Sequence, residues 1–189
     1  MKKIYSVACL ILVILLFQNC KKSSSTDTTP TTPLPLLRAN VNGTTWTPDT
    51  LNATITYNTA LKTKVLSFTG TRDQQRVTCS VTLKNATAAN DFTLDDYNVD
   101  DTGNPLMVYS AQQKSSNGSY VFVPLATATA NNGKVSITAV DNAGGVLTGT
   151  FSFTYSKLNY DSNGEVVSVT NYAVTGGTFT KMPYTFITK

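Results

Sequence analysis

The 189-residue chain lacks histidine and contains a single glutamate, Glu165. The absence of histidine removes the commonest general base, the catalytic triads and dyads built on it, and most protein zinc sites. A glycosidase with two carboxylates would have to use aspartates that lie roughly 5 to 9 Å apart in a cleft. The sequence also has no G-x-S-x-G motif and no P-loop. We therefore predict that the protein is not an enzyme.

Charge is scarce as well, at 14% of residues, with 15 basic and 11 acidic side chains. Lys2 and Lys3 belong to a predicted leader, and without them 13 basic side chains remain against 11 acidic ones, a balance of +2. No basic stripe remains that could follow a phosphate backbone. We therefore do not expect nucleic acid as a partner.

Long apolar runs are missing apart from one segment near the N-terminus, residues 4–17. At about 14 residues this segment is shorter than the roughly 20 that a membrane-spanning helix needs. It follows two lysines and has the length of the apolar part of a secretory signal. We predict that residues 1–19 form a signal peptide.

The apolar segment ends with FQNC at residues 17–20, where a bacterial lipoprotein signal places the cysteine that becomes acylated. The usual lipobox has Leu at −3 and small residues after it, and a looser box followed by lysines resembles that of Bacteroidetes-type lipoproteins. Each buried methylene of an acyl chain contributes about 0.8 kcal/mol, so several chains such as palmitate form a lasting anchor. Cys20 is therefore the predicted lipidation site, and the alternative is a leader in which Cys20 is an idle thiol.

Residues 20–35, CKKSSSTDTTPTTPLP, contain almost no apolar side chain, and their prolines favour extended polyproline geometry. The stretch reaches at most about 50 Å, at roughly 3.3 Å per residue. We predict a tether that holds a domain at the outer membrane of a Gram-negative cell envelope. The absence of an acidic run after Cys20 favours the periplasmic face over the cell surface, and both orientations stay open.

Only one cysteine, Cys79, remains after the leader and the lipidation site account for Cys9 and Cys20. It lies in RVTCSVTL, where alternate residues from Val77 to Leu83 are apolar and share one face of a strand. We expect a buried core thiol with no disulfide partner rather than a nucleophile, since no histidine is available to activate it.

What is abundant, from residue 36 onward, is the alternation of apolar residues with threonine and serine. It recurs at residues 51–57, 64–70, 133–140 and, most clearly, in VLTGTFSFTY at residues 146–155. Turn sequences such as Asn42-Gly43, NNG, DNAGG and DSNG separate these runs. We predict one domain over residues 36–189, an all-β antiparallel β-sandwich of roughly ten strands, with a closed β-barrel as the alternative.

Three segments carry a family resemblance: RANVNGTTWTP at 38–48, GKVSITAVDNAGGVLTGTFSFTY at 133–155 and VTGGTFTKMPY at 174–184. They resemble the A-x-V-N-G-x-x-W opening, the I-T-G-T-F-S-F strand and the closing T-x-G-x-F of a group of Bacteroidetes lipoproteins of unknown function. The resemblance covers most of the chain from Arg38 and implies a cell-envelope lipoprotein domain. It supplies no catalytic residues.

Aspartates are concentrated in NDFTLDDYNVDDTGN, residues 90–104. Calcium prefers carboxylate, amide and carbonyl oxygens, and Asp96, Asn98 and Asp100 have the 1-3-5 spacing that starts an EF-hand. The segment is not an EF-hand, because the sixth position is Asp101 rather than glycine and the twelfth is not glutamate. These four residues are a candidate calcium site, and the alternative is a solvated acidic loop; we expect no other cofactor.

Aromatic residues offer a last recognition chemistry, since sugar rings stack on them. We expect Trp46 in core or edge packing, whereas Tyr97, Tyr160 and Tyr172 lie near turns and are candidates for exposure. Together these observations favour a non-enzymatic envelope module that binds a protein or a glycan through its loops. The alternatives are a structural subunit of a surface or outer-membrane assembly, which a long uncharged edge strand would favour, and a glycan-acting hydrolase that uses aspartates.

Overall fold

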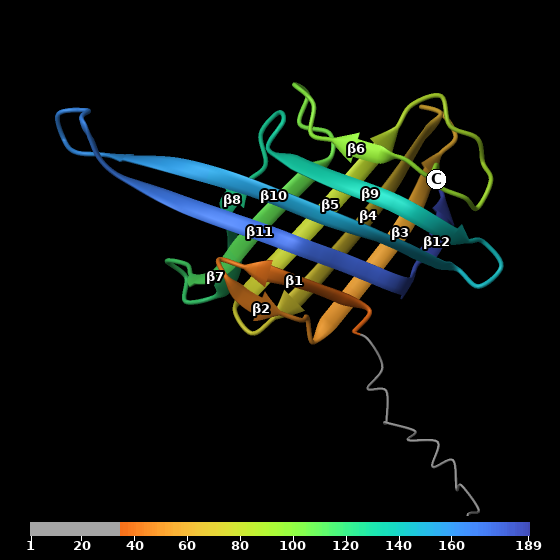
Figure 1. The fold of residues 1–189 in the computed structure, drawn as a ribbon, viewed down its shortest axis with the longest axis horizontal. Helices are drawn as coiled ribbons and strands as arrows, with labels where there is room; N and C mark the ends of the chain where they lie inside the picture. The colour runs from red at the N-terminus through yellow and green to blue at the C-terminus, as the bar shows by residue number, and fades with distance from the viewer. Residues whose placement is uncertain (1–34) are drawn as a thin grey trace, which may run out of the picture. The chain divides into compact units, whose positions relative to one another are not determined.

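The computed structural model describes residues 35–189. The predicted signal peptide, Cys20 and all but the last residue of the tether lie outside the described residues. The described chain contains twelve strands in two six-stranded sheets (Figure 1). They are β1 (Leu37–Val41), β2 (Thr44–Trp46), β3 (Thr50–Asn58), β4 (Thr63–Arg72), β5 (Gln75–Leu83), β6 (Asp96–Asn98), β7 (Leu106–Lys114), β8 (Tyr120–Thr127), β9 (Gly133–Asp141), β10 (Val146–Tyr160), β11 (Val166–Pro183) and β12 (Thr185–Thr188).

The two sheets pack face to face as a sandwich, which confirms the predicted fold class. The first has the strand order β2-β1-β11-β10-β9-β6 and the second β12-β3-β4-β5-β7-β8. Each sheet keeps two edge strands, so the sheets do not close on one another and the closed alternative is wrong. None of the described residues forms a helix of the length and hydrophobicity that a bilayer crossing requires.

Two details differ from the sequence-based expectation. Residues 35–189 form twelve strands rather than roughly ten, and two of them, β2 and β6, have only three residues each, too few to show a period of two. The second sheet is mixed rather than purely antiparallel, because β12 runs parallel to β3 with Thr185 opposite Thr54. This arrangement follows from the chain crossing from the first sheet to the second between β11 and β12.

The predicted hairpin at Asn42-Gly43 is present and joins β1 to β2. Both residues have positive φ angles, 49° for Asn42 and 83° for Gly43. Two-residue hairpin turns of this kind match the right-handed twist of the strands, and asparagine and glycine adopt them most readily. The NG dipeptide therefore sets the register of β1 and β2.

The centre of the core is a cluster of three phenylalanines that come from both sheets. The ring of Phe68 on β4 lies 5.5 Å from that of Phe151 and 5.2 Å from that of Phe179, measured between centroids. On β10 and β11, Gly149 pairs with Phe179 and Gly177 pairs with Phe151. A Cβ atom at Gly149 would lie 2.4 Å from the Phe179 ring and 2.1 Å from a backbone oxygen of β9. Gly149 of LTGTF and Gly177 of TGGTF are thus needed for close packing.

β10 and β11 are longer than their neighbours and project together beyond the sandwich (Figure 1). β9 accompanies β10 only as far as the pair Gly133 and Phe153, and β1 accompanies β11 only as far as Val41 and Val174. From there β10 and β11 pair only with each other, out to Tyr160 and Val166. We call this two-stranded projection, residues 154–173, the arm.

Candidate interaction surface

The candidate calcium residues lie on β6 and in the following turn, and two of the four have protein partners. The Asp96 carboxylate accepts a hydrogen bond from Lys134 Nζ at 2.8 Å. Asp100 Oδ1 accepts bonds from the Thr102 backbone N–H and hydroxyl and from the Asn104 backbone N–H, at 2.7 to 2.9 Å. Among residues 35–189, no three Cys, Asp or Glu side chains are placed to hold one metal ion. Calcium binding stays a prediction.

These contacts also set the electrostatics of the acidic segment. The hydrogen bond from Lys134 is the largest cause that lowers the pKa of Asp96. The hydrogen bond from the Thr102 hydroxyl is the largest cause that lowers the pKa of Asp100. Both carboxylates are therefore held in the charged form by protein donors. The two other candidates are exposed: Asn98 and Asp101.

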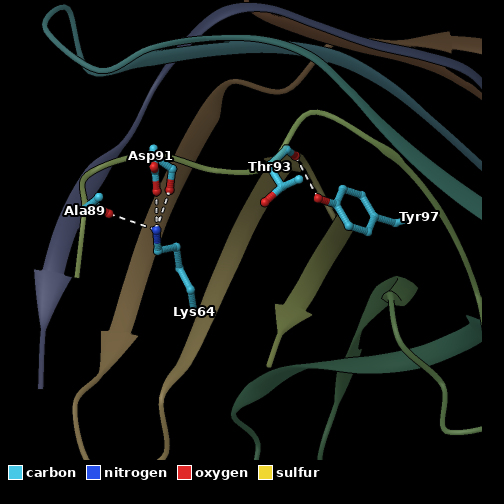
Figure 2. A network of polar contacts seen from close by, with 5 residues as sticks. All are labelled: Lys64, Ala89, Asp91, Thr93 and Tyr97. Carbon is cyan, nitrogen blue, oxygen red and sulfur yellow. Dashed lines mark hydrogen bonds and ion pairs between the residues drawn. The ribbon is translucent and has the colours of Figure 1, made fainter. Parts of the chain in front are cut away.

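A buried lysine that the sequence analysis did not single out anchors the start of this segment. Lys64 Nζ donates to the backbone oxygens of Ala89, at 2.9 Å, and Asp91, at 3.0 Å, and to the Asp91 carboxylate (Figure 2). The Lys64 side chain is 3% exposed and that of Asp91 49%. Every ammonium proton has an acceptor, so Lys64 has a structural role. The sequence feature that could have predicted its burial is the alternation along β4, which places Lys64 on the same buried face as Leu66 and Phe68.

Trp46 is only 3% exposed, as expected for core or edge packing. Its Nε1 has no hydrogen-bond partner among the described residues. The residue borders a cleft of about 580 Å³ that is otherwise lined mainly by polar residues, among them Arg72 and Asp73. Because the indole is buried, it offers no face on which a sugar ring could stack.

The three candidate tyrosines do not converge on one surface. Tyr97 lies on β6, where its hydroxyl donates to the Thr93 backbone oxygen at 2.7 Å (Figure 2) and burial raises its pKa. Tyr172 lies on β11 and is half-buried, with its ring centroid 6.2 Å from that of Tyr109. Only Tyr160, on β10 in the arm, is exposed. The described residues thus bring no set of candidate tyrosines together for stacking.

Cys79 is a core residue, which confirms the expectation for this thiol. Its side chain is fully buried on β5, opposite Phe68 of β4. Burial strongly raises the pKa of the thiol. Since the thiolate is the reactive form, Cys79 is poorly suited to nucleophilic chemistry.

The arm carries five of the eleven large apolar side chains that are exposed in the described residues. Their exposed fractions range from 46% to 62%. Single exposed apolar residues are common on soluble proteins, but a contiguous group of them marks an interaction surface more often. We call this group the arm patch: Leu158, Tyr160, Val166, Val167 and Val169.

Four residues of the arm patch, Leu158, Tyr160, Val167 and Val169, lie on the face opposite to the core. Phe151 and Phe153 point into the sandwich, and strict alternation along β10 places Asn159 on that same side and Leu158 on the outward side. Asn159 Nδ2 donates to the hydroxyls of Ser168 and Thr170 on β11, at 3.1 and 3.0 Å. Within the sandwich, the inward face of β10 and β11 is therefore apolar and the outward face polar. In the arm, the inward face is polar and the outward face is apolar.

Both edges of the arm lack a strand partner among the described residues. In an antiparallel strand, successive residues direct their N–H and C=O groups alternately to the two sides. Thr154 donates its N–H to Asn132, on the β9 side, so Ser156, Leu158 and Tyr160 direct their backbone groups to that same unpaired side. The arm thus presents free backbone donors and acceptors next to the arm patch.

The second edge of the arm is uncharged. The Ala173 carbonyl oxygen accepts a hydrogen bond from the Asn42 backbone N–H, on the side of β11 that faces β1. By alternation, Asn171 and Val169 direct their N–H and C=O groups to the same side of β11, where β1 no longer pairs with it. β11 has no charged residue between Val166 and Thr180. Proteins commonly protect an exposed edge with charges, prolines or bulges, and within the arm, residues 166–173, this edge has only one bulge, near the tip. It matches the long uncharged edge that would favour an assembly subunit.

Comparison with known proteins finds a family model that matches the arm and all strands of the two sheets except β12. Residues 34–183 match a family model described as "Domain of unknown function (DUF6252)". No curated protein and no solved structure matches the chain. The matched segment runs from before β1 to the end of β11 and covers more than half of the chain. The chain therefore belongs to the DUF6252 family, a domain of unknown function.

Proposed function

We propose that the protein is a lipid-anchored, non-enzymatic interaction module of the bacterial cell envelope, and that the arm is the element that contacts its partner. The observation that carries this proposal is the arm patch, five exposed apolar side chains on a ribbon with two unpaired edges. An isolated two-stranded hairpin is only marginally stable in water. A partner that covers the arm would remove apolar surface from water and satisfy its free backbone groups.

A protein fits this surface better than a glycan does. Strand addition combines main-chain hydrogen bonds with pockets for alternate side chains, and the arm offers both a free edge and an apolar face. Sugar recognition relies on aromatic faces, and only Tyr160 offers one on the arm. Most aspartates expected of a hydrolase lie in turns and loops, apart from Asp96 on β6 and Asp141 at the end of β9, and no three acidic side chains cluster among residues 35–189. These features rank the protein-binding module above the glycan-binding and hydrolase alternatives.

The predicted tether joins the domain at the end remote from the arm. Leu37, the first residue of β1, pairs with Phe179, thirteen residues along β11 from Val166. At roughly 3.3 Å per residue, this separation is about 43 Å. With Cys20 acylated, the tether would therefore enter the domain at the end of β11 opposite to the arm.

Site-specific photocrosslinking in the native envelope tests this proposal. A photoreactive amino acid at Leu158 or Val169 should form a protein adduct, and the same group at Thr150 should not. Thr150 is a matched control because it is exposed on β10 within the sandwich. Arm positions that give no adduct above the Thr150 background, in parallel with an empty glycan array, would refute a binding role for the arm.

A structural subunit of an envelope assembly is a second candidate, favoured by the uncharged edge of β11. That edge is rich in β-branched residues, and strand addition along it would join copies or partners into a larger array. The adducts separate the two candidates. A ladder of adducts of increasing mass would favour the assembly, and a single discrete adduct would favour the binding module.

A further inference from the structure

The charges of the arm are arranged so that a second copy of the same arm complements them. Lys157 lies partway along β10 opposite Thr170, and it has no ion-pair partner among the described residues. Asp161 and Glu165 flank the turn at the tip, where Asp161 Oδ1 accepts the Asn163 and Glu165 backbone N–H groups at 2.9 Å. The arm is thus positive along its shaft and negative at its tip.

We propose that two copies of the chain associate through the free edges of β10, antiparallel and related by a two-fold axis at Asn159. This inference rests on the proposed role of the arm and names its partner. In this register Leu158 faces Tyr160 of the second copy, and Lys157 faces Asp161 of the second copy. Because the two copies are related by a two-fold axis, each of these contacts occurs twice in the dimer. The pairing turns two separate ribbons into one four-stranded sheet.

The direction of the backbone N–H and C=O groups is the first argument for this register. Leu158 and Tyr160 both direct their N–H and C=O groups to the unpaired side of β10, as the Thr154 hydrogen bond to β9 indicates. An antiparallel pair of such residues exchanges two backbone hydrogen bonds. A slip by a single residue would place polar side chains against the arm patch, because it exchanges the two faces of a strand.

The side chains that would face each other also favour the axis at Asn159 over the neighbouring axes. With the axis moved to Leu158, Asp161 would face Tyr155 of the second copy, and with the axis moved to Tyr160, Leu158 would face Ser162 of the second copy. Both shifts lose the contact between Lys157 and Asp161. Only the axis at Asn159 matches apolar residues with apolar ones and opposite charges with each other. The two carboxylates at the tip also disfavour an anionic lipid surface as the occupant.

Cysteine crosslinking of the full chain tests the register. Residues on the axis at Asn159 form a non-hydrogen-bonded pair with Cα atoms about 4.5 Å apart, which suits a disulfide. After mild oxidation, peptide mapping of Asn159→Cys should find a disulfide that joins position 159 of two copies. The matched control Thr150→Cys, on β10 within the sandwich, should give no such link. Cys79 is fully buried and should not take part.

Charge reversal gives a second readout that does not depend on Asn159. Lys157 is exposed, so Lys157→Glu should leave the fold unchanged, and it should raise the dimer dissociation constant of the full chain in detergent at least about tenfold. Lys157→Gln should raise it less. Sedimentation velocity measures both. A wild-type chain that stays monomeric at about 100 μM, with no link at position 159, overturns the self-pairing.

The outcomes separate this inference from the proposed function. Two outcomes overturn the self-pairing. In the first, the chain is monomeric and its arm photocrosslinks to a different protein. In the second, the chain is monomeric and its arm binds lipid vesicles. In the first of these cases the binding module stands. Absence of every adduct, including one between two copies, overturns both. Photocrosslinked homodimers that Lys157→Glu abolishes support both.

Discussion

At the scale of single residues, the DUF6252 domain depends on positions where a side chain would not fit. Gly149 and Gly177 each lie opposite a phenylalanine on the neighbouring strand, and the rings occupy the space above them. This arrangement gives the LTGTF and TGGTF segments a structural meaning. They are packing signatures of the β10–β11 pair, not elements of a site.

Gly149→Ala should destabilise the domain by about 1 to 3 kcal/mol, the usual range for overpacking. The new methyl group would lie 2.1 Å from a β9 backbone oxygen, so the strands would have to move. Urea unfolding monitored by tryptophan fluorescence measures the effect. The control Thr150→Ala, at the exposed neighbouring position, should stay within about 0.5 kcal/mol. Equal stability of the two variants would contradict the packing described for Gly149.

The Asp100 carboxylate predicts an acid-dependent loss of stability. Protein hydrogen bonds lower its pKa, so its stabilising contribution is present above the ordinary aspartate pKa of about 3.9 and is lost as the pH falls through the lower folded value. Asp100→Asn keeps an acceptor oxygen for the turn but does not titrate. Its free energy of unfolding should therefore fall less steeply than that of the wild type between about pH 5 and pH 2. Parallel curves for the two proteins would contradict this role of Asp100.

At the scale of elements, the sequence predicted strands wherever alternation ran long enough, as in β4 and β10. It did not predict β2 and β6, since three residues carry no periodic signal and pair only because a neighbouring strand is in place. Lys64 was missed for a related reason. Alternation put it on the buried face, but the loop oxygens that receive its protons come from residues 89–91 and are visible only in three dimensions.

The sequence predicted the strands of the arm but not their projection beyond the sandwich. Apolar residues change parity between Tyr155 and Leu158, which marks the point where the outward face becomes the apolar one. The parity change alone does not reveal a projection, because the projection exists only where β9 and β1 stop pairing with β10 and β11. Tyr160 was named as a candidate for exposure, but its neighbours in the arm patch were not.

The arm patch should contribute to binding and not to stability. Leu158→Ser combined with Val169→Ser removes two exposed apolar side chains that pair across the arm, so the free energy of unfolding should change by no more than about 1 kcal/mol. The same double variant should lose most of the protein adducts formed by a photoreactive group at Tyr160. Phe153→Ala, within the core, should cost about 3 to 5 kcal/mol. A comparable loss in the arm variant would show that the patch packs inside the protein.

At the scale of the whole molecule, a predicted membrane anchor precedes a domain whose projecting arm is the proposed contact element. The family match and the fold describe the domain, and the anchor is predicted from the residues that precede it. The lipoprotein leader stays a prediction, made from the sequence alone because export machinery reads a short linear pattern. The partner was not predictable, since recognition depends on which strand edges remain free after the sandwich has formed.

Cys20→Ser should release the chain from the membrane fraction into the soluble envelope fraction. Removal of the acylated residue removes about 0.8 kcal/mol for each methylene that was buried in the bilayer. Fractionation with immunodetection measures the shift, and Cys79→Ser is the matched control because its thiol is buried in the domain. Continued membrane association of the Cys20 variant, with the control unchanged, would contradict acylation as the anchor.

Hydrogen exchange of the full chain, in its native membrane and after dilution in detergent, tests most directly whether a partner covers the arm. The account predicts that the backbone amides of Ser156, Leu158 and Tyr160 exchange slowly in the membrane and rapidly after dilution. Amides on the buried pairing side of the sandwich, such as those of Phe151, should stay protected in both states. Rapid exchange of the three arm amides in the membrane would contradict the account.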